Sequence, residues 1–193
     1  LFMLPVVWLF LSSLKTETQY NSIPIIFFPN PPEWSNYVEA VTEYPFMKYA
    51  NNSLFLAGIS TALTVISSAL AGFGFARRKA RLRKIFFVLV LAMMMVPRMV
   101  TIIPTFIFFS RLRLTNTYWP WILWGATGAP FHIFLFRQFF SSIPQDLEDA
   151  AVVDGCGGFR VFWQIFLPNS GPAIATSAIF HFRRSEEHTS ELQ

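Results

Sequence analysis

The sequence has little charge and almost no cysteine. Only 13% of the 193 residues are Asp, Glu, Lys or Arg, about half of the share of roughly 25% that is usual in soluble domains. The single cysteine excludes a small domain held together by disulfide bonds. By contrast, 53% of the residues are hydrophobic and 23 are phenylalanine, which excludes a disordered chain. This composition indicates a protein whose surface faces lipid.

Three long apolar runs organise the chain. A helix needs about 20 apolar residues to cross a bilayer, and residues 54–76, 85–109 and 118–136 supply runs of that length. Residues 1–14 and 171–182 are shorter runs of the same kind, which we interpret as partial spans. A soluble domain built around three such helices would need a larger core than 193 residues provide. We therefore predict an all-α, polytopic transmembrane helix bundle with about three complete spans and two partial ones.

The distribution of charge predicts the orientation of these spans. Six of the eight residues in 77–84 are Lys or Arg, whereas residues 16–52 carry four acidic residues and one lysine. Because cytoplasmic loops are enriched in Lys and Arg, we place 77–84 in the cytoplasm and 16–52 outside. The loop after Phe140 then returns to the cytoplasm, while Arg111 and Arg113 are exceptions on the outer side. A nucleic-acid patch explains the basic cluster less well, since no DNA-binding element accompanies it.

The second cytoplasmic loop, residues 141–168, has the pattern of two short helices joined at a glycine. Ser142 is placed to cap the first helix, and Pro144 suits an early helical position. Gly155 can adopt the left-handed conformation that ends a helix. Pro168 marks the return to the next span.

The first of these helices carries a narrow stripe of small apolar residues. Leu147, Ala150 and Ala151 are spaced at i, i+3 and i+4, so they share one helix face. Carboxylates near the start complement the positive end of the helix dipole; they are Asp146, Glu148 and Asp149. We interpret this face as one that docks against another surface.

The spacing within the loop resembles the signature of the permease subunits of binding-protein-dependent ABC importers. That signature is Glu-Ala-Ala, three residues, Gly, nine residues, and then Ile-x-Leu-Pro. Here residues 149–151 read Asp-Ala-Ala, Gly155 follows after three residues, and 165–168 read Ile-Phe-Leu-Pro after nine more. Asp149 replaces the signature Glu and keeps its charge, and Glu148 beside it could partly substitute.

Residues 1–182 are most similar to the carbohydrate-uptake branch of this family, the sugar permeases of the maltose and glycerol-phosphate type. Stretches similar to that branch are 31–38, 52–54, 95–104, 116–120 and 136–140. The family has six spans in a type I importer bundle, so we expect this chain to be truncated at both ends and to stop within the fifth span. Residues 183–193 resemble a translated sequencing adaptor, and we expect this tail to be non-native.

The resemblance implies a membrane permease subunit of an ATP-driven sugar importer. It implies cytoplasmic ATP-binding subunits, a second permease subunit, an extracytoplasmic solute-binding protein, a sugar substrate, and a multi-pass location in a bacterial or archaeal cell membrane, with no nucleic acid. ATP hydrolysis is expected on the partner subunit, so this chain is not expected to be an enzyme or to hold a cofactor or metal. The residues expected to couple it to the ATPase are Leu147, Glu148, Asp149, Ala150, Ala151, Asp154, Gly155, Ile165, Leu167 and Pro168.

Three other residues need interpretation, two of them in the apolar runs and one in the loop 141–168. Arg98, between two prolines, either faces the translocation path or pairs with backbone carbonyls that the prolines free. His132 is more typical of an interhelical hydrogen bond than of a metal ligand. Cys156 has no second cysteine to pair with and is expected to be a small residue beside Gly155.

Other classes of membrane protein fit less well. A membrane protease would need an HExxH helix or a Ser/His pair within the spans, and the sequence shows neither arrangement. An ion-coupled transporter is expected to carry acidic residues within its spans, and the runs 54–76, 85–109 and 118–136 contain no acidic residue. The alternatives that stay open are an importer permease for another solute and a structural membrane protein that does not transport.

Overall fold

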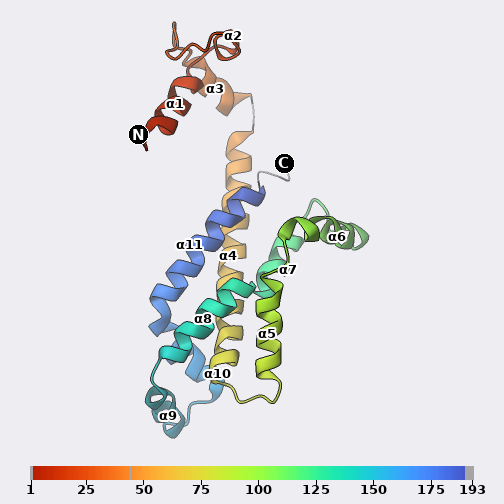
Figure 1. The fold of residues 1–193 in the computed structure, drawn as a ribbon, viewed down its shortest axis with the longest axis vertical. Coiled ribbons are helices and arrows are strands. Elements are labelled where there is room, and N and C mark those ends of the chain that lie inside the picture. The colour runs from red at the N-terminus through yellow and green to blue at the C-terminus, as the bar shows by residue number, and fades with distance from the viewer. Residues whose placement is uncertain (1, 44, 190–193) are drawn as a thin grey trace. The chain divides into compact units, whose positions relative to one another are not determined.

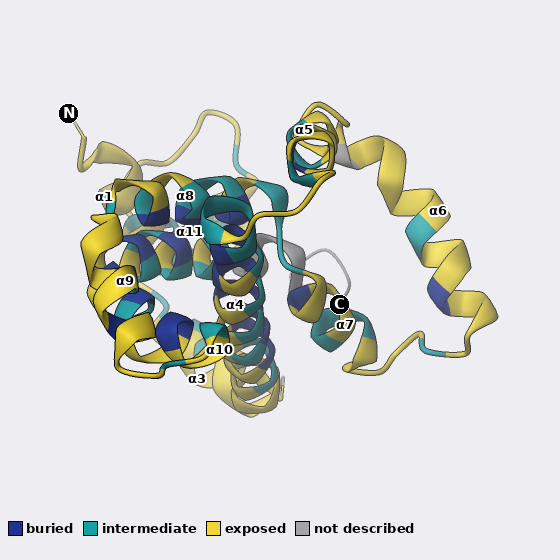
Figure 2. Cartoon of the chain, turned by 90° about the horizontal axis from the view of Figure 1, so that it is seen from below, coloured by how far each residue is buried: buried dark blue, intermediate teal, exposed yellow. Residues whose placement is uncertain are grey.

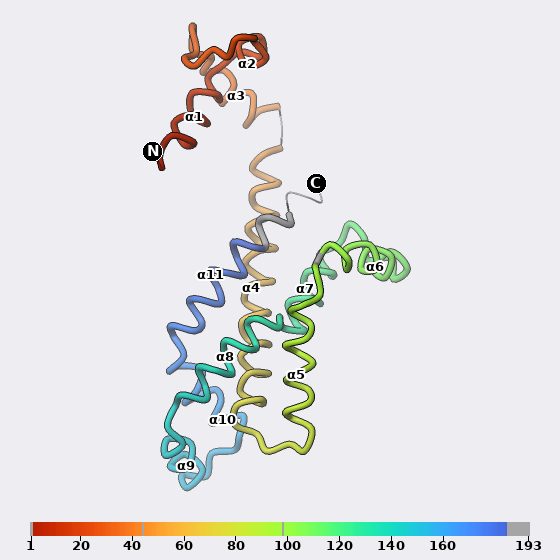
Figure 3. The backbone as a smooth tube through the Cα atoms, in the orientation of Figure 1, coloured from red at the N-terminus to blue at the C-terminus, as the bar shows by residue number. Residues whose placement is uncertain are grey.

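The computed structural model describes residues 2–43 and 45–189, with the side chains of Arg98 and of residues 185–189 left aside. Every regular element in the described part is helical (Figure 1; the backbone trace is in Figure 3). The chain forms two compact units, Leu1–Asn52 and Ser53–Gln193.

The first unit is held together by polar contacts between its helices. Its elements are α1 (Leu4–Ser13), α2 (Glu17–Tyr20) and α3 (Ser35–Thr42). The Ser13 hydroxyl lies 2.6 Å from the Tyr37 hydroxyl. The Asn36 amide donates to the carbonyls of Ser13 and Lys15, each at 3.0 Å. These bonds tie α3 to the end of α1.

The second unit contains the long helix α4 and the helices that follow it. Helix α4 starts at Phe46, before the boundary between the units, and ends at Arg77. The later elements are α5 (Arg83–Met93), α6 (Arg98–Arg111), α7 (Trp119–Thr127), α8 (Pro130–Ser142), α9 (Gln145–Val153), α10 (Gly158–Val161), the π-helical turn η1 (Phe162–Phe166), the 3₁₀ turn η2 (Pro168–Ser170) and α11 (Gly171–Thr189).

Two of the three apolar runs are not single helices. Run 85–109 breaks at Pro97, whose extended backbone (φ −62°, ψ 131°) starts α6. Run 118–136 breaks at Gly128, with φ +73°, just before Pro130 starts α8. Hydropathy does not detect these breaks because proline and glycine change the backbone without adding charge. Within the described part, α4 alone is long and apolar enough to cross a membrane as one helix.

Hydroxyl groups of α4 satisfy the backbone at the second break. Ser68 Oγ accepts from the backbone N–H of Ala129 at 3.1 Å. Ser67 Oγ donates to the carbonyl of Gly125 at 2.9 Å. Backbone groups freed by a helix break are costly in lipid unless they are paired, so these two serines allow α7 and α8 to change direction.

Glycines bring α7 and α8 close to α4. A Cβ at Gly72 would lie 2.7 Å from Cβ of Phe136, and one at Gly125 would lie 3.0 Å from the carbonyl oxygen of Ser60. Small residues permit such close approach between helices in membranes. Buried residues gather where the helices meet (Figure 2). One hydrophobic core cluster among them consists of Val65, Ala69, Phe73, Phe136, Phe140, Ala151, Val161, Phe162, Phe166 and Ala173.

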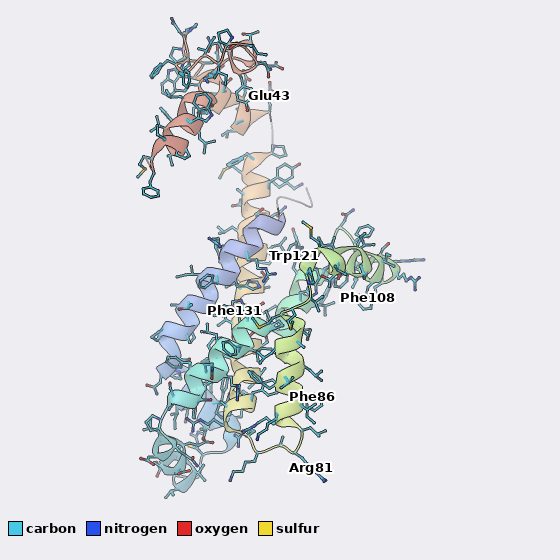
Figure 4. The ribbon with its side chains drawn as sticks, viewed as in Figure 1. Glu43, Arg81, Phe86, Phe108, Trp121 and Phe131 are labelled. Carbon is cyan, nitrogen blue, oxygen red and sulfur yellow. The ribbon has the colours of Figure 1, made fainter. Side chains whose placement is uncertain are left out.

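A polar cluster links α4, α8 and α11. His132 Nδ1 lies 2.8 Å from the Ser177 hydroxyl, so the expected interhelical hydrogen bond is confirmed. The ring nitrogens of His181 lie 3.1 Å from the hydroxyls of Thr61 and Thr64. An aromatic contact adds to this packing, with the rings of Phe131 and Phe180 6.0 Å apart; Phe131 is labelled on α8 in Figure 4.

Candidate coupling site

The loop between α8 and α11 forms two arms joined at a tight turn (Figure 1). The first arm is α9, which begins at Gln145 after Pro144. Ser142 does not cap it, contrary to the prediction: Ser142 ends α8, and its hydroxyl donates to the Phe139 carbonyl at 2.7 Å. Pro144 is the residue that precedes α9, because its extended backbone (ψ 140°) turns the chain between the two helices.

Gly155 ends the first arm in the left-handed conformation that the sequence predicts, with φ +81°. The N–H of Gly155 donates to the carbonyl of Val152 at 3.0 Å, and the N–H of Cys156 donates to the carbonyl of Ala151 at 2.9 Å. This pair of bonds is the Schellman arrangement, which satisfies the last carbonyls of a helix. Cys156 is partly buried against the same core as Ala151, which fits the expected small residue beside the turn.

The second arm is anchored by aromatic side chains. Phe162 and Phe166 are almost fully buried. The ring of Phe166 lies 4.9 Å from that of Phe73 and 5.6 Å from that of Phe140, so η1 packs against both α4 and α8. Ile165 and Leu167, two of the predicted site residues, are partly buried against this core. Pro168 is exposed and begins the turn that leads into α11.

The two faces of α9 differ in exposure. Leu147 is 47% exposed, whereas Ala151 is 7% exposed and lies in the core. The apolar stripe is therefore divided, with one end of it turned toward the bundle. Glu148 is of intermediate exposure, and the other predicted docking residues on this arm and its turn are exposed: Asp149, Ala150, Asp154 and Gly155.

Arg77, the last residue of α4, joins the bundle to this loop. Its Nε and Nη2 donate to the carbonyl of Phe140 at 3.2 and 2.8 Å, and Nη2 also donates to the carbonyl of Ile143. Nε lies 3.9 Å from Oε2 of Glu148. The guanidinium group lies 4.9 Å from the centre of the Phe166 ring. One side chain thus contacts the end of α8, the first arm and the second arm.

In the sequence, Arg77 stands out only as one of the six cations in residues 77–84 that are predicted to orient the spans. A single signal in the sequence sets it apart: it is the first of these cations and lies on the apolar helix, where it is closest to the bundle. The residues that it contacts are 63 to 89 residues away in the sequence, from Phe140 to Phe166. Local patterns do not reveal such a pairing.

The two neighbouring carboxylates of α9 have different surroundings. Glu148 faces the bundle and pairs with Arg77, and both side chains are largely covered, at 16% and 10% exposed. Asp149, the residue at the signature Glu position, is exposed. Glu148 is therefore engaged within the chain, and Asp149 is the carboxylate presented outward.

Arg98 begins α6, directly after the break at Pro97. Its side chain lies outside the described part of the structure, so its relation to a translocation path stays a prediction. The break itself separates α6 from α5, and Arg98 is therefore not part of one continuous helix that starts at Ile85.

A comparison with protein families identifies the class of this chain. The family described as the binding-protein-dependent transport system inner membrane component matches residues 64–185, a stretch that includes the whole loop 141–168. The chain belongs to this family. Members of this family are inner membrane components of transport systems, and they are not enzymes.

Curated members of the family resemble most of the chain. The chain is 33% identical over 179 residues to the sulfoquinovosyl glycerol transport system permease protein SmoH of Agrobacterium fabrum, covering 92% of this chain and 63% of SmoH. It is 34% identical over 178 residues to the arabinooligosaccharides transport system permease protein AraQ of Halalkalibacterium halodurans, covering 91% of this chain and 63% of AraQ. The chain thus spans about 63% of the length of these permeases.

A solved structure shows the same fold. It is the crystal structure of a bacterial ABC transporter involved in the import of the acidic polysaccharide alginate, with a TM-score of 0.81 and 21% identity, covering 95% of this chain and 65% of that chain. With the family match, this confirms the predicted fold class, the all-α bundle of a type I ABC importer permease.

Proposed function

We propose that this chain is part of the permease subunit of an ATP-driven sugar importer, and that residues 141–168 couple it to a cytoplasmic ATP-binding subunit. The membership of the family supports the permease role. The sugar-derived substrates in the names of SmoH and AraQ support a carbohydrate as the transported solute. The observation that carries the coupling role is the division of α9 into an exposed face and a face held by the bundle.

The exposed face supplies the docking surface in this proposal. Leu147 and Ala150 offer apolar contact, and Asp149 and Asp154 offer carboxylates that can pair with cations of the partner. Gly155 fixes the end of the helix, so the partner meets a surface of defined shape. None of these groups needs to carry out chemistry, because coupling requires only that a push on α9 reaches the spans.

The inward face transmits that push. Ala151 packs in the core, and Glu148 pairs with Arg77 at the end of α4. Hydrogen bonds from a charged donor contribute about 1.5–3 kcal/mol each, and Arg77 makes such bonds to two carbonyls of the α8 end. Ile165 and Leu167 hold the second arm on the same core, and Pro168 starts the return to α11. Movement of α9 therefore reaches α4, α8 and α11 together.

The remaining parts of the importer follow from the same proposal. A second permease subunit and an extracytoplasmic solute-binding protein would complete it, in the cell membrane of a bacterium or archaeon. Arg98 at the start of α6 is the proposed contact for sugar hydroxyls along the path. Residues 16–52, which carry four acidic residues and one lysine, would face outward and the basic turn 77–84 inward, as the charge distribution predicts.

Substitution of Gly155 by valine tests the coupling role. The backbone at Gly155 has φ +81°, which a β-branched residue adopts only with strain. Gly157 is the matched control, since a Cβ there also meets open space but its φ of −70° suits valine. In the full-length permease with its partner subunits, we expect Gly155→Val to lose transport and transport-coupled ATP hydrolysis while the subunit stays inserted. Gly157→Val should retain both.

Two results would contradict the proposal. Normal transport by Gly155→Val would show that the shape of this turn does not matter for coupling. Equal loss in both variants would show that the loop tolerates no bulk, which is a packing effect and not a docking effect. Insertion is measured separately by the amount of permease in washed membranes.

A further inference from the structure

The turn between α4 and α5 is strongly basic, and its cations differ in where they lie. Arg77 faces the bundle, as described above. The next five cations follow within seven residues: Arg78, Lys79, Arg81, Arg83 and Lys84. Of these, Arg83 is of intermediate exposure and bonds to the carbonyls of Ala76 and Arg78, and the other four are exposed. Within the described residues, the one ion pair of this cluster is the Arg77–Glu148 pair.

An apolar groove begins at the end of this turn. Lys84, Ile85, Val88 and Leu89 line a shallow groove of about 260 Å³ on the surface of α5. The three apolar residues are 58%, 61% and 54% exposed. Because they are spaced at i, i+3 and i+4, they form one strip that runs along the helix away from Lys84. Figure 4 shows Arg81 on the turn and Phe86 on the adjoining part of α5.

A cation at the head of an apolar strip matches the chemistry of one kind of ligand. An anionic phospholipid carries a phosphate that Lys84 and Arg81 can pair with, and acyl chains that Ile85, Val88 and Leu89 can cover. A free phosphate compound would use the cations only and leave the strip uncovered. A zwitterionic lipid would use the strip but bring no net charge. We propose that the α4–α5 turn and the adjoining strip of α5 bind an anionic phospholipid.

The inference is independent of the transported sugar and of the coupling loop. It requires that α4 and α5 lie in a membrane, which agrees with the family of inner membrane components. It also goes beyond the orientation of the spans, because orientation depends on the number of cations near the ends of the spans and not on their position relative to a groove. Juxtamembrane clusters of four to eight cations attract anionic lipids, and the groove adds a specific place for one.

A pair of substitutions separates a specific site from a general attraction. Lys84→Gln and Lys79→Gln each leave five cations in residues 77–84, so both should keep the same orientation in the membrane. Lys84 lines the groove, and Lys79 does not. Both side chains are exposed, so neither change should affect folding.

The test is a titration of the purified full-length permease complex in detergent, followed by native mass spectrometry. The probes are phosphatidylglycerol, phosphatidylcholine with the same acyl chains, and glycerol 3-phosphate. We expect phosphatidylglycerol to bind more tightly than phosphatidylcholine and Lys84→Gln to weaken its binding about fivefold. Lys79→Gln should weaken it less than twofold, about the limit of a distant surface charge.

A third variant tests the apolar part. Val88→Asn places a polar amide in the strip and should weaken phosphatidylglycerol while leaving Lys84 intact. Equal effects of Lys84→Gln and Lys79→Gln would overturn the proposal in favour of unspecific attraction. Equal affinity for the two lipids would overturn it too. Full displacement of the lipid by glycerol 3-phosphate would show a phosphate site without an acyl groove, which also contradicts it.

Discussion

The two arms of the loop 141–168 are similar in length but differ in how many of their residues are buried in the bundle. The first arm, α9, places a single residue, Ala151, in the core and exposes most of the others. The second arm, α10 with η1, buries Val161, Phe162 and Phe166. The first arm is therefore mostly exposed and has few contacts with the bundle, whereas the second arm is anchored to the bundle by its buried side chains. A loop built in this way can offer one side to a partner while the other side stays part of the bundle.

Arg77 contacts both arms of this loop. It pairs with Glu148 on the first arm and lies against the ring of Phe166 on the second. Because it belongs to α4, it also connects both arms to the long span. The difference between the arms can therefore be tested by substitutions at the anchor (Phe166), at the link (Arg77) and on the exposed face of α9 (Leu147).

Removal of the anchor should have the largest effect. Phe166→Ala removes a fully buried ring that contacts Phe73 and Phe140. Truncation of a buried Phe costs about 3–5 kcal/mol, so we expect a large fall in the thermal midpoint of the full-length permease in detergent. Trp163→Ala is the control, since Trp163 is 50% exposed on the same turn. A fall as large for Trp163 as for Phe166 would contradict the assignment of the anchor.

Loss of the link should have a smaller effect on stability. Arg77→Ala removes the donor to the carbonyls of Phe140 and Ile143 and leaves Glu148 without its cation. We expect a destabilisation of about 2–3 kcal/mol and faster amide hydrogen exchange across α9. Arg77→Lys keeps the charge but not the two-carbonyl contact, so its effect should be intermediate.

A matched control for this prediction is Arg81, an exposed cation of the same turn. Arg81→Ala removes the same charge from the turn, so a purely electrostatic role would give both variants the same exchange rates in α9. That result would exclude Arg77 as the link between the arms.

Substitution on the exposed face should affect stability least. Leu147→Ala changes a half-exposed side chain on α9, and surface substitutions of this kind stay within about 0.5 kcal/mol. The thermal midpoint should stay nearly unchanged, while the permease should retain less ATP-binding subunit when the complex is purified. A large loss of stability with intact assembly would place Leu147 in the fold and not on the docking surface.

Local features of this molecule could be predicted from the sequence, and features that depend on distant partners could not. The left-handed turn at Gly155 and the two-arm loop follow from helix-ending signals within a few residues. The break at Gly128 was missed because hydropathy alone does not register the local signals Gly128 and Pro130. The hydrogen bonds that Ser67 and Ser68 make to the backbone at this break, from about 60 residues earlier, could not be predicted either. The role of Arg77 was missed because its contacts are also distant in the sequence. Ser142 was assigned to the wrong helix end because a hydroxyl can bond to the helix before it as well as cap the one after it.

The division of α9 into two faces can be measured directly by cross-linking. Single cysteines would replace Ala150 and Ala151 in a full-length permease in which Cys156 and any further cysteine are serine, assembled with its ATP-binding subunit. A short bifunctional thiol-to-amine reagent then reports which position faces that subunit. We predict that Ala150→Cys joins to the ATP-binding subunit and that Ala151→Cys, whose native side chain is 7% exposed, does not. Cross-linking from Ala151→Cys alone, or from neither position in an assembled complex, would contradict the account.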